Sequence, residues 1–440
     1  MTWLNMNKLV RNSLFTNAML LTVAGILCRV IGFFFRIYLS RTFGAENIGI
    51  YQLIGPIMAL AYSLTVSGFQ TAISKLVASN ENGLFIFSIG CLCSLGLSCV
   101  ISQYVYQNSH FLATEFLLEA RTEPLLKVLS LSFPVSSIHS CINGYFYGKK
   151  NAGFPALSQL IEQLFRVLSV YIMCSILYKS NSVPSLSYAV AGMVIGEVAA
   201  CFISLFYLWY SEHNAIYTSE KSPSYPALIS GLFVLALPLS ASRVVQNALQ
   251  SIEAIALPNM LQEYGLDTAS AFSHFGILTG MTLPLVLFPT AITSSIAVML
   301  MPEISQAQAH GQNKTIQNAF KKSIFFCFIM GFAFTTILIA FSKPISIYIF
   351  KEPLCAVYIR TLCFMCPFMY CNTTLSSIMH GLGKTISSFM ITVITLTMRL
   401  VLIYICVPKL GMQGYLFIML MSQILLFCMQ MRILKKAIPE

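Results

Sequence analysis

Apolar stretches recur along the whole chain and alternate with short polar or turn-rich breaks. Each stretch reaches the ~20 residues that an α-helix needs to cross a hydrocarbon layer ~30 Å thick. No polar stretch between them is long enough to form a soluble domain. The pattern predicts an all-α integral membrane protein with about twelve transmembrane helices, at residues 13–39, 48–76, 83–107, 124–147, 153–178, 186–210, 227–257, 269–300, 319–342, 354–380, 385–407 and 411–433.

The central break, from Ser211 to Tyr225, divides the predicted helices into six and six. An even number of helices in each half permits two parallel repeats. We therefore predict an N-terminal six-helix lobe at residues 1–215 and a C-terminal six-helix lobe at residues 216–440.

Arginines at matched depths support this internal repeat. Arg29 in the first predicted helix and Arg243 in the seventh lie at about the same depth. In the fifth and eleventh helices, Arg166 and Arg399 each lie 18 residues after a glycine. Because two such pairs fall in matched helices, the pattern favours two related halves over a coincidence.

Lysine and arginine residues in the loops indicate the orientation in the membrane. With a cytoplasmic N-terminus, the inner segments carry thirteen Lys and Arg residues and the outer segments carry seven. The acidic loops near Glu115–Glu123 and Glu263–Asp267 then lie outside. We predict a multi-pass protein of the cell membrane with both termini in the cytoplasm.

Composition agrees with the membrane assignment and limits the partners. The chain is 57% hydrophobic and 9% charged, whereas an average soluble domain is roughly 25% charged. Its net charge of +11 reflects the inner-side bias together with arginines inside the helices, so we expect membrane lipids but no nucleic acid as partners. The 14 cysteines lie mostly in apolar stretches, and we therefore expect no metal and no other cofactor.

Motifs that would carry enzyme chemistry are missing from the sequence. We find no convincing Walker A loop, HExxH, GxSxG or metal-holding acidic cluster. No sizeable loop is available to hold catalytic groups outside the membrane. The sequence therefore favours a transporter over an enzyme.

Several charged residues lie at membrane depth, where a charge is costly and usually faces a bundle interior or a wet cavity. Arg29 and Arg36 are two helical turns apart and share one face of the first helix. An excess of guanidinium groups suits an anionic headgroup, because the planar fork of arginine matches phosphate oxygens. The embedded set is Arg29, Arg36, Arg166, Arg243, Arg360 and Arg399, with Glu162, Glu197 and Glu253 as acids.

Structural roles are open for some of these residues. Glu162 and Arg166 are four residues apart and would neutralise each other on one helix face. Arg36 and Arg360 would be able to extend to the membrane interface instead. Glu253 and Glu162 are the candidates for ion or proton coupling, with an arginine partner as the alternative for Glu253. We expect structural, hydrogen-bonded roles for the isolated histidines His139, His274 and His380.

Prolines mark where the predicted helices would bend. Pro284 and Pro289 both lie in the eighth helix. Each removes a backbone hydrogen bond, and the freed carbonyl must find another partner or face a cavity. We predict that this helix is the hinge for alternating access, with a static kink as the alternative.

Several segments resemble the stage V sporulation protein B group of polysaccharide flippases, in the multidrug/oligosaccharidyl-lipid/polysaccharide (MOP) exporter superfamily that includes the lipid II flippases. The resemblance covers most of the chain and is most specific in the first and eighth helices. The segments are GILCRVIG from Gly25, RTFGAENIGIYQ from Arg41, GFQTAISKLV from Gly68, LTGMTLP from Leu278 and FPTAI from Phe288.

The resemblance implies two lobes around a central cavity that opens alternately to each side of the membrane. It also implies an undecaprenyl-pyrophosphate-linked sugar as substrate, such as a peptidoglycan precursor, and cell-wall synthesis proteins as candidate partners. By analogy with arginines that line the cavity of lipid II flippases, Arg29, Arg36 and Arg243 match the pyrophosphate-binding role. Lys75 matches the basic residue that ends the second-helix motif. Members of this group generally have fourteen helices, and this chain has about twelve.

The sequence therefore predicts a flippase for a lipid-linked oligosaccharide, with substrate contacts at Arg29, Arg36, Arg243, Arg399, Arg166 and Lys75. The alternative is an ion-coupled multidrug or cation exporter on the same scaffold. Such an exporter would depend on an embedded carboxylate and would tolerate loss of the arginines.

Overall fold

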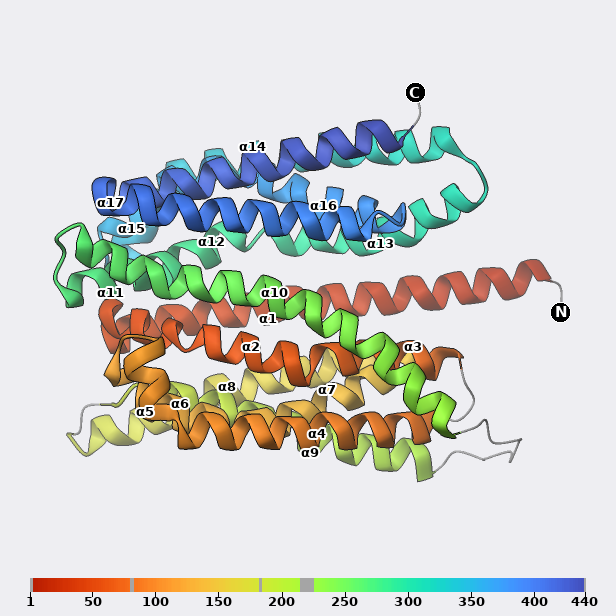
Figure 1. Ribbon diagram of the computed structural model, residues 1–440, viewed down its shortest axis with the longest axis horizontal. Coiled ribbons are helices and arrows are strands. Elements are labelled where there is room, and N and C mark those ends of the chain that lie inside the picture. The colour runs from red at the N-terminus through yellow and green to blue at the C-terminus, as the bar shows by residue number, and fades with distance from the viewer. Residues whose placement is uncertain (1–2, 80–82, 182–183, 214–224, 439–440) are drawn as a thin grey trace. The chain divides into compact units, whose positions relative to one another are not determined.

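The computed structural model describes residues 3–79, 83–181, 184–213 and 225–438, and these are helical without any β-strand (Figure 1). Most of the predicted central break, residues 214–224, lies outside the described residues. The helices are α1 (Trp3–Leu53), α2 (Gly55–Thr65), α3 (Ser67–Ser79), α4 (Gly83–Gln107), α5 (Ser109–Phe111), η1 (Leu112–Phe116), η2 (Ala120–Thr122), α6 (Glu123–Ser130), α7 (Ser132–Gly148), α8 (Gly153–Lys179), α9 (Ser187–His213), α10 (Tyr225–Glu263), α11 (Thr268–Gly276), η3 (Ile277–Thr282), α12 (Leu283–Leu287), α13 (Thr290–Ala309), α14 (Asn313–Pro344), η4 (Ile345–Phe350), α15 (Leu354–Leu362), η5 (Cys363–Met365), α16 (Cys366–Gly381) and α17 (Thr385–Ala437).

Nine helical stretches in the described residues are long and apolar enough to cross a membrane, and the bent pair α6–α7 makes a tenth. Two of the nine are too long for one crossing: Met19–Ser79 has 61 residues and α17 has 53, whereas one crossing takes about 20. Counting two crossings in each gives twelve for the part of the chain that the structure describes. The prediction of an all-α membrane protein with about twelve transmembrane helices is confirmed.

Glycines provide the break in each of the two long stretches. Gly44 has φ 79° in α1, and Gly411 has φ 59° in α17. A positive φ is costly for residues with a Cβ but is readily adopted by glycine. The chain therefore turns at Gly44, between the predicted first and second crossings, and at Gly411, the first residue of the predicted twelfth crossing.

The helices form two compact units. Unit 1 contains residues 1–32 and 53–251, and unit 2 contains residues 33–52 and 252–440. The boundary therefore cuts through both α1 and α10, so that each of these helices contributes its first part to unit 1 and its later part to unit 2. The predicted lobe boundary near residue 215 follows the sequence repeat, and it stays a prediction.

Unit 1 has a hydrophobic core rich in aromatic residues between α3, α4, α7, α8 and α10, with side chains of α9 packed against it. Phe146 packs against Phe154 with ring centroids 4.9 Å apart, and Phe154 stacks on Tyr207 at 4.2 Å with the rings nearly parallel. Burying such large side chains supplies much of the packing energy of a helical unit. This core holds α7 and α9 in place, the two helices that carry the buried polar residues described below.

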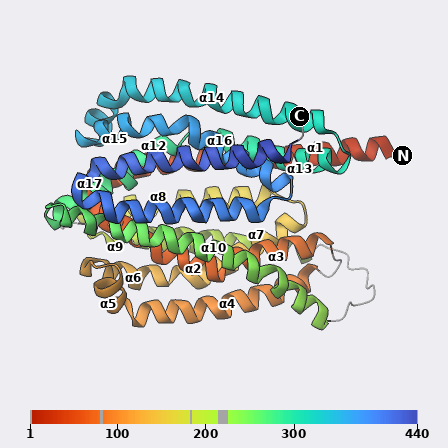
Figure 2. The ribbon, with the colours of Figure 1, turned by 45° about the horizontal axis from the view of Figure 1, so that its top comes forward.

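Unit 2 contains a close helix contact between the end of α1 and the α11–η3 segment. A Cβ at Gly49 would collide with the Phe272 backbone, and a Cβ at Gly276 would collide with the Ala45 backbone. Small residues spaced four apart allow such close approach of two helices in a membrane. Elsewhere in unit 2, α13, α14, α16 and α17 run side by side in both views (Figures 1 and 2).

The eighth predicted helix is irregular at its prolines. It consists of α11, the π-helix η3, the short α12 and then α13, with Pro284 near the start of α12 and Pro289 just before α13. Pro289 has no N–H to donate to Leu285, and the Phe288 N–H bonds that carbonyl oxygen instead at 3.2 Å. The helix is therefore interrupted at Pro289, whereas the bend and its role as a hinge stay predictions.

Replacement of Gly276 by alanine tests the close contact in unit 2. The new Cβ would overlap the Ala45 carbonyl oxygen, which belongs to the backbone and cannot rotate away. We expect Gly276→Ala to destabilise the protein by about 1–3 kcal/mol, the usual range for overpacking. The measurement is the thermal unfolding midpoint of the purified protein in detergent.

Gly25→Ala is the matched control, because a Cβ at Gly25 meets nothing within 4 Å. Since alanine favours a helix over glycine, this variant should be at least as stable as the parent. Equal unfolding midpoints for Gly276→Ala and Gly25→Ala would contradict the described packing.

Candidate functional site

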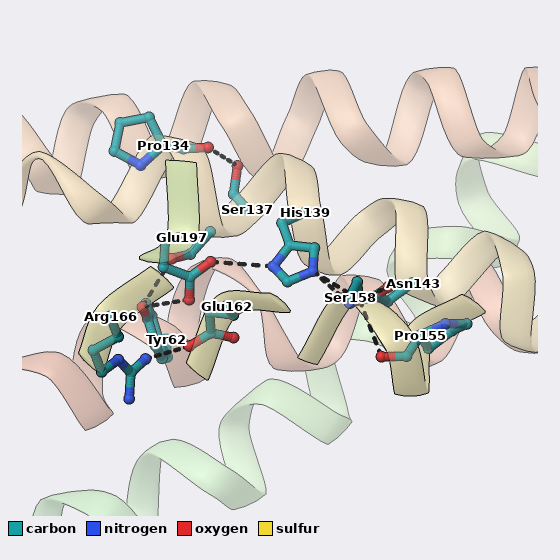
Figure 3. Close-up of polar contacts among 11 residues, drawn as sticks. Tyr62, Pro134, Ser137, His139, Asn143, Pro155, Ser158, Glu162, Arg166 and Glu197 are labelled. Atoms are coloured by element: carbon teal, nitrogen blue, oxygen red, sulfur yellow. Dashed lines mark hydrogen bonds and ion pairs between the residues drawn. The ribbon is translucent and has the colours of Figure 1, made fainter. Parts of the chain in front are cut away.

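A largely buried cluster of polar residues lies between α2, α7, α8 and α9 of unit 1 (Figure 3). We call it the His139 cluster. His139 on α7 is 4% exposed and Glu197 on α9 is 8% exposed, so both lie in an environment where a lone charge would be costly. The members of the cluster are Tyr62 on α2, His139 and Asn143 on α7, Ser158, Glu162 and Arg166 on α8, and Glu197 on α9.

The imidazole of His139 is bonded at both nitrogens. Its Nδ1 lies 3.1 Å from Glu197 Oε2, and its Nε2 lies 3.1 Å from both Ser158 Oγ and Asn143 Nδ2. The other carboxylate oxygen of Glu197 accepts from the Tyr62 hydroxyl at 3.5 Å. The expected hydrogen-bonded role of His139 is thus present, but its partner is a buried carboxylate.

Glu162 forms an ion pair with Arg166, one turn along α8. This is the neutralising arrangement that their spacing allows. His139, Glu162 and Glu197 also offer ligand atoms that all lie within 4.8 Å of one another, close enough to hold a cation. The absence of a metal from this protein stays a prediction.

Glu253 in unit 2 has two partners. Arg399 on α17 forms an ion pair with one carboxylate oxygen, and the Tyr415 hydroxyl donates to the other at 2.8 Å. The Glu253 carboxylate is thereby matched by one guanidinium group. The Nε atom of Arg399 is buried without a hydrogen-bond partner in the described residues.

Other residues that were predicted to bind substrate are exposed or half-buried. Arg29 on α1 and Arg243 on α10 are both exposed and both belong to unit 1. Arg243 donates to the Ser67 carbonyl oxygen at 3.4 Å. In unit 2, the half-buried Arg36 donates to the carbonyl oxygen of Thr279 in η3, also at 3.4 Å.

Two further predicted residues have simpler surroundings. Lys75 is exposed on α3, and Arg360 is exposed on α15 and donates to the Ser342 hydroxyl at 2.8 Å. The structure therefore brings Arg166 and Arg399 to carboxylates, and it leaves Arg29, Arg243 and Lys75 exposed. The substrate-binding role predicted for Arg29, Arg36, Arg243, Arg399, Arg166 and Lys75 stays a prediction, whereas Arg360 was not among these residues.

Sequence reasoning missed the pairing of His139 with Glu197 and of Glu253 with Tyr415. These partners are 58 and 162 residues apart on different helices. Helical spacing reveals neighbours within a turn or two of one helix, so it gives no signal for such pairs. The only available signal was that two acids and a histidine at membrane depth each needed a partner.

The ion pair of Glu253 gives a testable consequence for stability. Arg399→Met would leave a buried carboxylate without its guanidinium partner, and breaking a buried pair in this way costs about 3–5 kcal/mol. We expect a marked drop in the thermal unfolding midpoint of the purified protein.

The double variant Glu253→Gln with Arg399→Met removes both charges and is the control. It should recover most of the lost stability, because no uncompensated charge remains. A double variant no more stable than Arg399→Met would show that the loss comes from packing and not from the pair.

Comparison with known proteins agrees with this architecture. A family model described as polysaccharide biosynthesis protein matches residues 14–308, and one described as MatE matches residues 243–405. The chain is 25% identical over 448 residues to stage V sporulation protein B of Bacillus subtilis (strain 168), covering 98% of this chain and 85% of that protein. It is 22% identical over 337 residues to lipid II flippase MurJ of the same organism, covering 71% of this chain and 61% of MurJ.

Solved structures share the fold. Lipid II flippase MurJ in an inward closed conformation matches with a TM-score of 0.70 and 16% identity over 95% of this chain and 87% of that one. An inward-facing multidrug resistance MATE family transporter of the MOP superfamily matches with a TM-score of 0.68 and 16% identity over 94% and 95% of the two chains. MurJ is named as a flippase and the MATE protein as a transporter, and the predicted resemblance is confirmed. This chain belongs to the polysaccharide biosynthesis protein family and is a flippase-like, multi-pass membrane protein of the MOP superfamily.

Proposed function

We propose that this protein is a flippase that moves an undecaprenyl-pyrophosphate-linked oligosaccharide or a peptidoglycan precursor across the cell membrane by alternating access. The observation that carries the proposal is the sign of the exposed charge on the membrane helices. The acids Glu162, Glu197 and Glu253 have partners inside their units, whereas Arg29 and Arg243 are exposed.

A guanidinium group on a membrane helix is costly in hydrocarbon, by about 2.5–3.5 kcal/mol or more at the helix centre. Arg29 and Arg243 therefore favour an aqueous path along unit 1, where they would meet an anionic headgroup. Pyrophosphate suits these residues, because its oxygens accept the paired N–H bonds of arginine. In the same proposal both termini are cytoplasmic and Lys75 lies at the cytoplasmic end of α3.

Relatives support the class of substrate. One relative is named lipid II flippase, and the family model that covers most of the chain is described as polysaccharide biosynthesis protein. The first name concerns the flipping of a lipid and the second the synthesis of a polysaccharide, and a lipid-linked oligosaccharide combines the two. The name of the relative that covers most of this chain, stage V sporulation protein B, makes sporulation the cellular setting that we propose.

A multidrug or cation exporter is the second candidate function. The MatE family model matches residues 243–405, and solved multidrug transporters share the fold. A cationic drug would be repelled by exposed arginines and would need an available carboxylate. Since the carboxylate of Glu253 is already matched by Arg399, the charge distribution favours the anionic substrate.

Transport in proteoliposomes tests the proposed function. The substrate is a fluorescent polyprenyl-pyrophosphate-linked sugar, and flipping is measured by protection of the label from a membrane-impermeant quencher. We expect Arg29→Ala and Arg243→Ala each to reduce the flipping rate at least about tenfold, the effect of losing 1.4 kcal/mol of binding in the transition state. The conservative lysine variants should retain part of the activity, because charge remains while the planar fork is lost.

Arg360→Ala is the matched control, since it also removes an exposed arginine from a membrane-associated helix. It should flip the substrate at the parental rate. Parental flipping by both Arg29→Ala and Arg243→Ala would contradict the proposed headgroup contacts. Efflux of a lipophilic cation that survives both substitutions would favour the exporter.

A further inference from the structure

The hydrogen bonds of the His139 cluster define which nitrogen of the imidazole carries the proton. The Ser158 hydroxyl lies 3.2 Å from Asn143 Oδ1 and donates to it. The Nδ2 atom of Asn143, which can only donate, then faces Nε2 of His139 at 3.1 Å. Nε2 therefore accepts, and the proton is on Nδ1, from which it is donated to Glu197 at 3.1 Å. This arrangement holds a neutral imidazole.

A second arrangement of the same side chains accommodates one more proton. When Nε2 is protonated, the Asn143 amide has to turn, because two donors would otherwise face each other. The turned amide presents Oδ1 to His139 and Nδ2 to the Ser158 oxygen. The Ser158 hydroxyl then donates to the Pro155 carbonyl oxygen, 3.0 Å away. No buried polar group loses its partner, a loss that would cost about 1–3 kcal/mol.

The charges in the cluster favour adding a single positive charge. With a neutral His139, the cluster contains two carboxylates, Glu162 and Glu197, and one guanidinium group, Arg166. The sum of formal charges in the cluster is then −1. One proton brings the sum to zero. The pair of Glu253 and Arg399 in unit 2 is already neutral, so a proton there would create an uncompensated charge.

Charged and titratable groups reach the site from each helix around it. His139 faces Glu197 of α9 and the hydroxyl of Tyr62 on α2, which bonds Glu197, while Glu162 and Arg166 come from α8. Two thiols lie within electrostatic range of these acids, Cys28 of α1 and Cys201 of α9. Since both thiols are neutral in their ordinary form, they do not change the sum of charges.

A divalent metal fits the cluster less well than a proton. The three possible ligands lie close enough together, but both imidazole nitrogens are already engaged, Nδ1 with Glu197 and Nε2 with Asn143. A divalent ion would also bring the sum of charges to +1 in a buried site, which is costly.

We propose that His139 and Glu197 form a reversible proton-binding site buried in unit 1. A proton from water bonds to Nε2 of His139, the Asn143 amide turns to accept it, and the reverse step returns the proton to water. We further propose that proton binding at this site is coupled to transport, a role that the sequence suggested for Glu253 or Glu162. This coupling role rests on the proposed function.

Nitrogen NMR on the full-length protein with 15N-labelled histidine tests the site directly. The chain has six histidines, and the His139 signal is the one that disappears in His139→Asn. As the pH is lowered from about 8 to about 5 in the experiment, we expect the His139 signal to change from the neutral Nδ1–H form to imidazolium. His274→Asn, which alters the histidine of unit 2 that bonds Tyr358, should leave this change intact.

Glu197→Gln is the second variant, because it keeps the shape of the cluster and removes the charge that balances imidazolium. It should abolish the imidazolium signal of His139 across the same range. A His139 signal that stays in one form throughout in the parent would overturn the proposal. So would a signal that responds to Zn²⁺ or Na⁺ at constant pH, which would assign the site to a metal cation.

Flipping under an imposed pH gradient separates this site from its proposed use. We expect the gradient to change the flipping rate of the parent and to have no effect on Glu197→Gln. If His139 of the parent titrates but the flipping rate does not depend on the gradient, the result supports the proton site and contradicts its coupling role. A parent that titrates but does not flip the lipid-linked sugar contradicts the proposed function and supports the proton site.

Discussion

The cost of placing a charge in the apolar interior of a membrane protein determines where every embedded ionisable residue of this molecule lies. Each of the three acids at membrane depth is buried or half-buried and has a positively charged or hydrogen-bonding partner within its own unit. Arg166 and Arg399 form ion pairs with two of these acids. Arg29 and Arg243 are exposed, whereas the acids are buried or half-buried. The proposed anionic cargo follows from this difference in exposure.

The packing of the helices supports these pairs. In unit 1, the aromatic core that includes Phe146 and Phe154 holds α7 against α9, so that His139 and Glu197 meet. In unit 2, the close contact of Gly49 and Gly276 brings the end of α1 against α11 and η3, where Arg36 reaches the Thr279 carbonyl oxygen. Both α1 and α10 contribute residues to both units.

Much of the fold was predictable from the sequence, because apolar length and charge exclusion act locally along the chain. The twelve stretches and the interruption of the helix at Pro289 each depend on residues within one or two helices. The pairing of Glu162 with Arg166 was open to prediction for the same reason. For Glu253 the sequence offered an arginine partner as an alternative but did not identify Arg399, and it gave no partner for His139, because Arg399 and Glu197 reach them through tertiary packing of helices far apart in the sequence. The division of α1 between the units also depends on tertiary contacts, and no local pattern marks residue 33 as a boundary.

The central claim is that the exposed arginines of unit 1 receive a pyrophosphate headgroup, and native mass spectrometry of the protein extracted with its lipids tests it most directly. The account predicts that the parent retains a polyprenyl-pyrophosphate species, and that the species is lost when Arg29 and Arg243 are both replaced by alanine. Retention of that species by the double variant would contradict the role of the arginines. A parent that never retains a pyrophosphate-linked lipid, while it retains lipophilic cations, would contradict the anionic cargo itself.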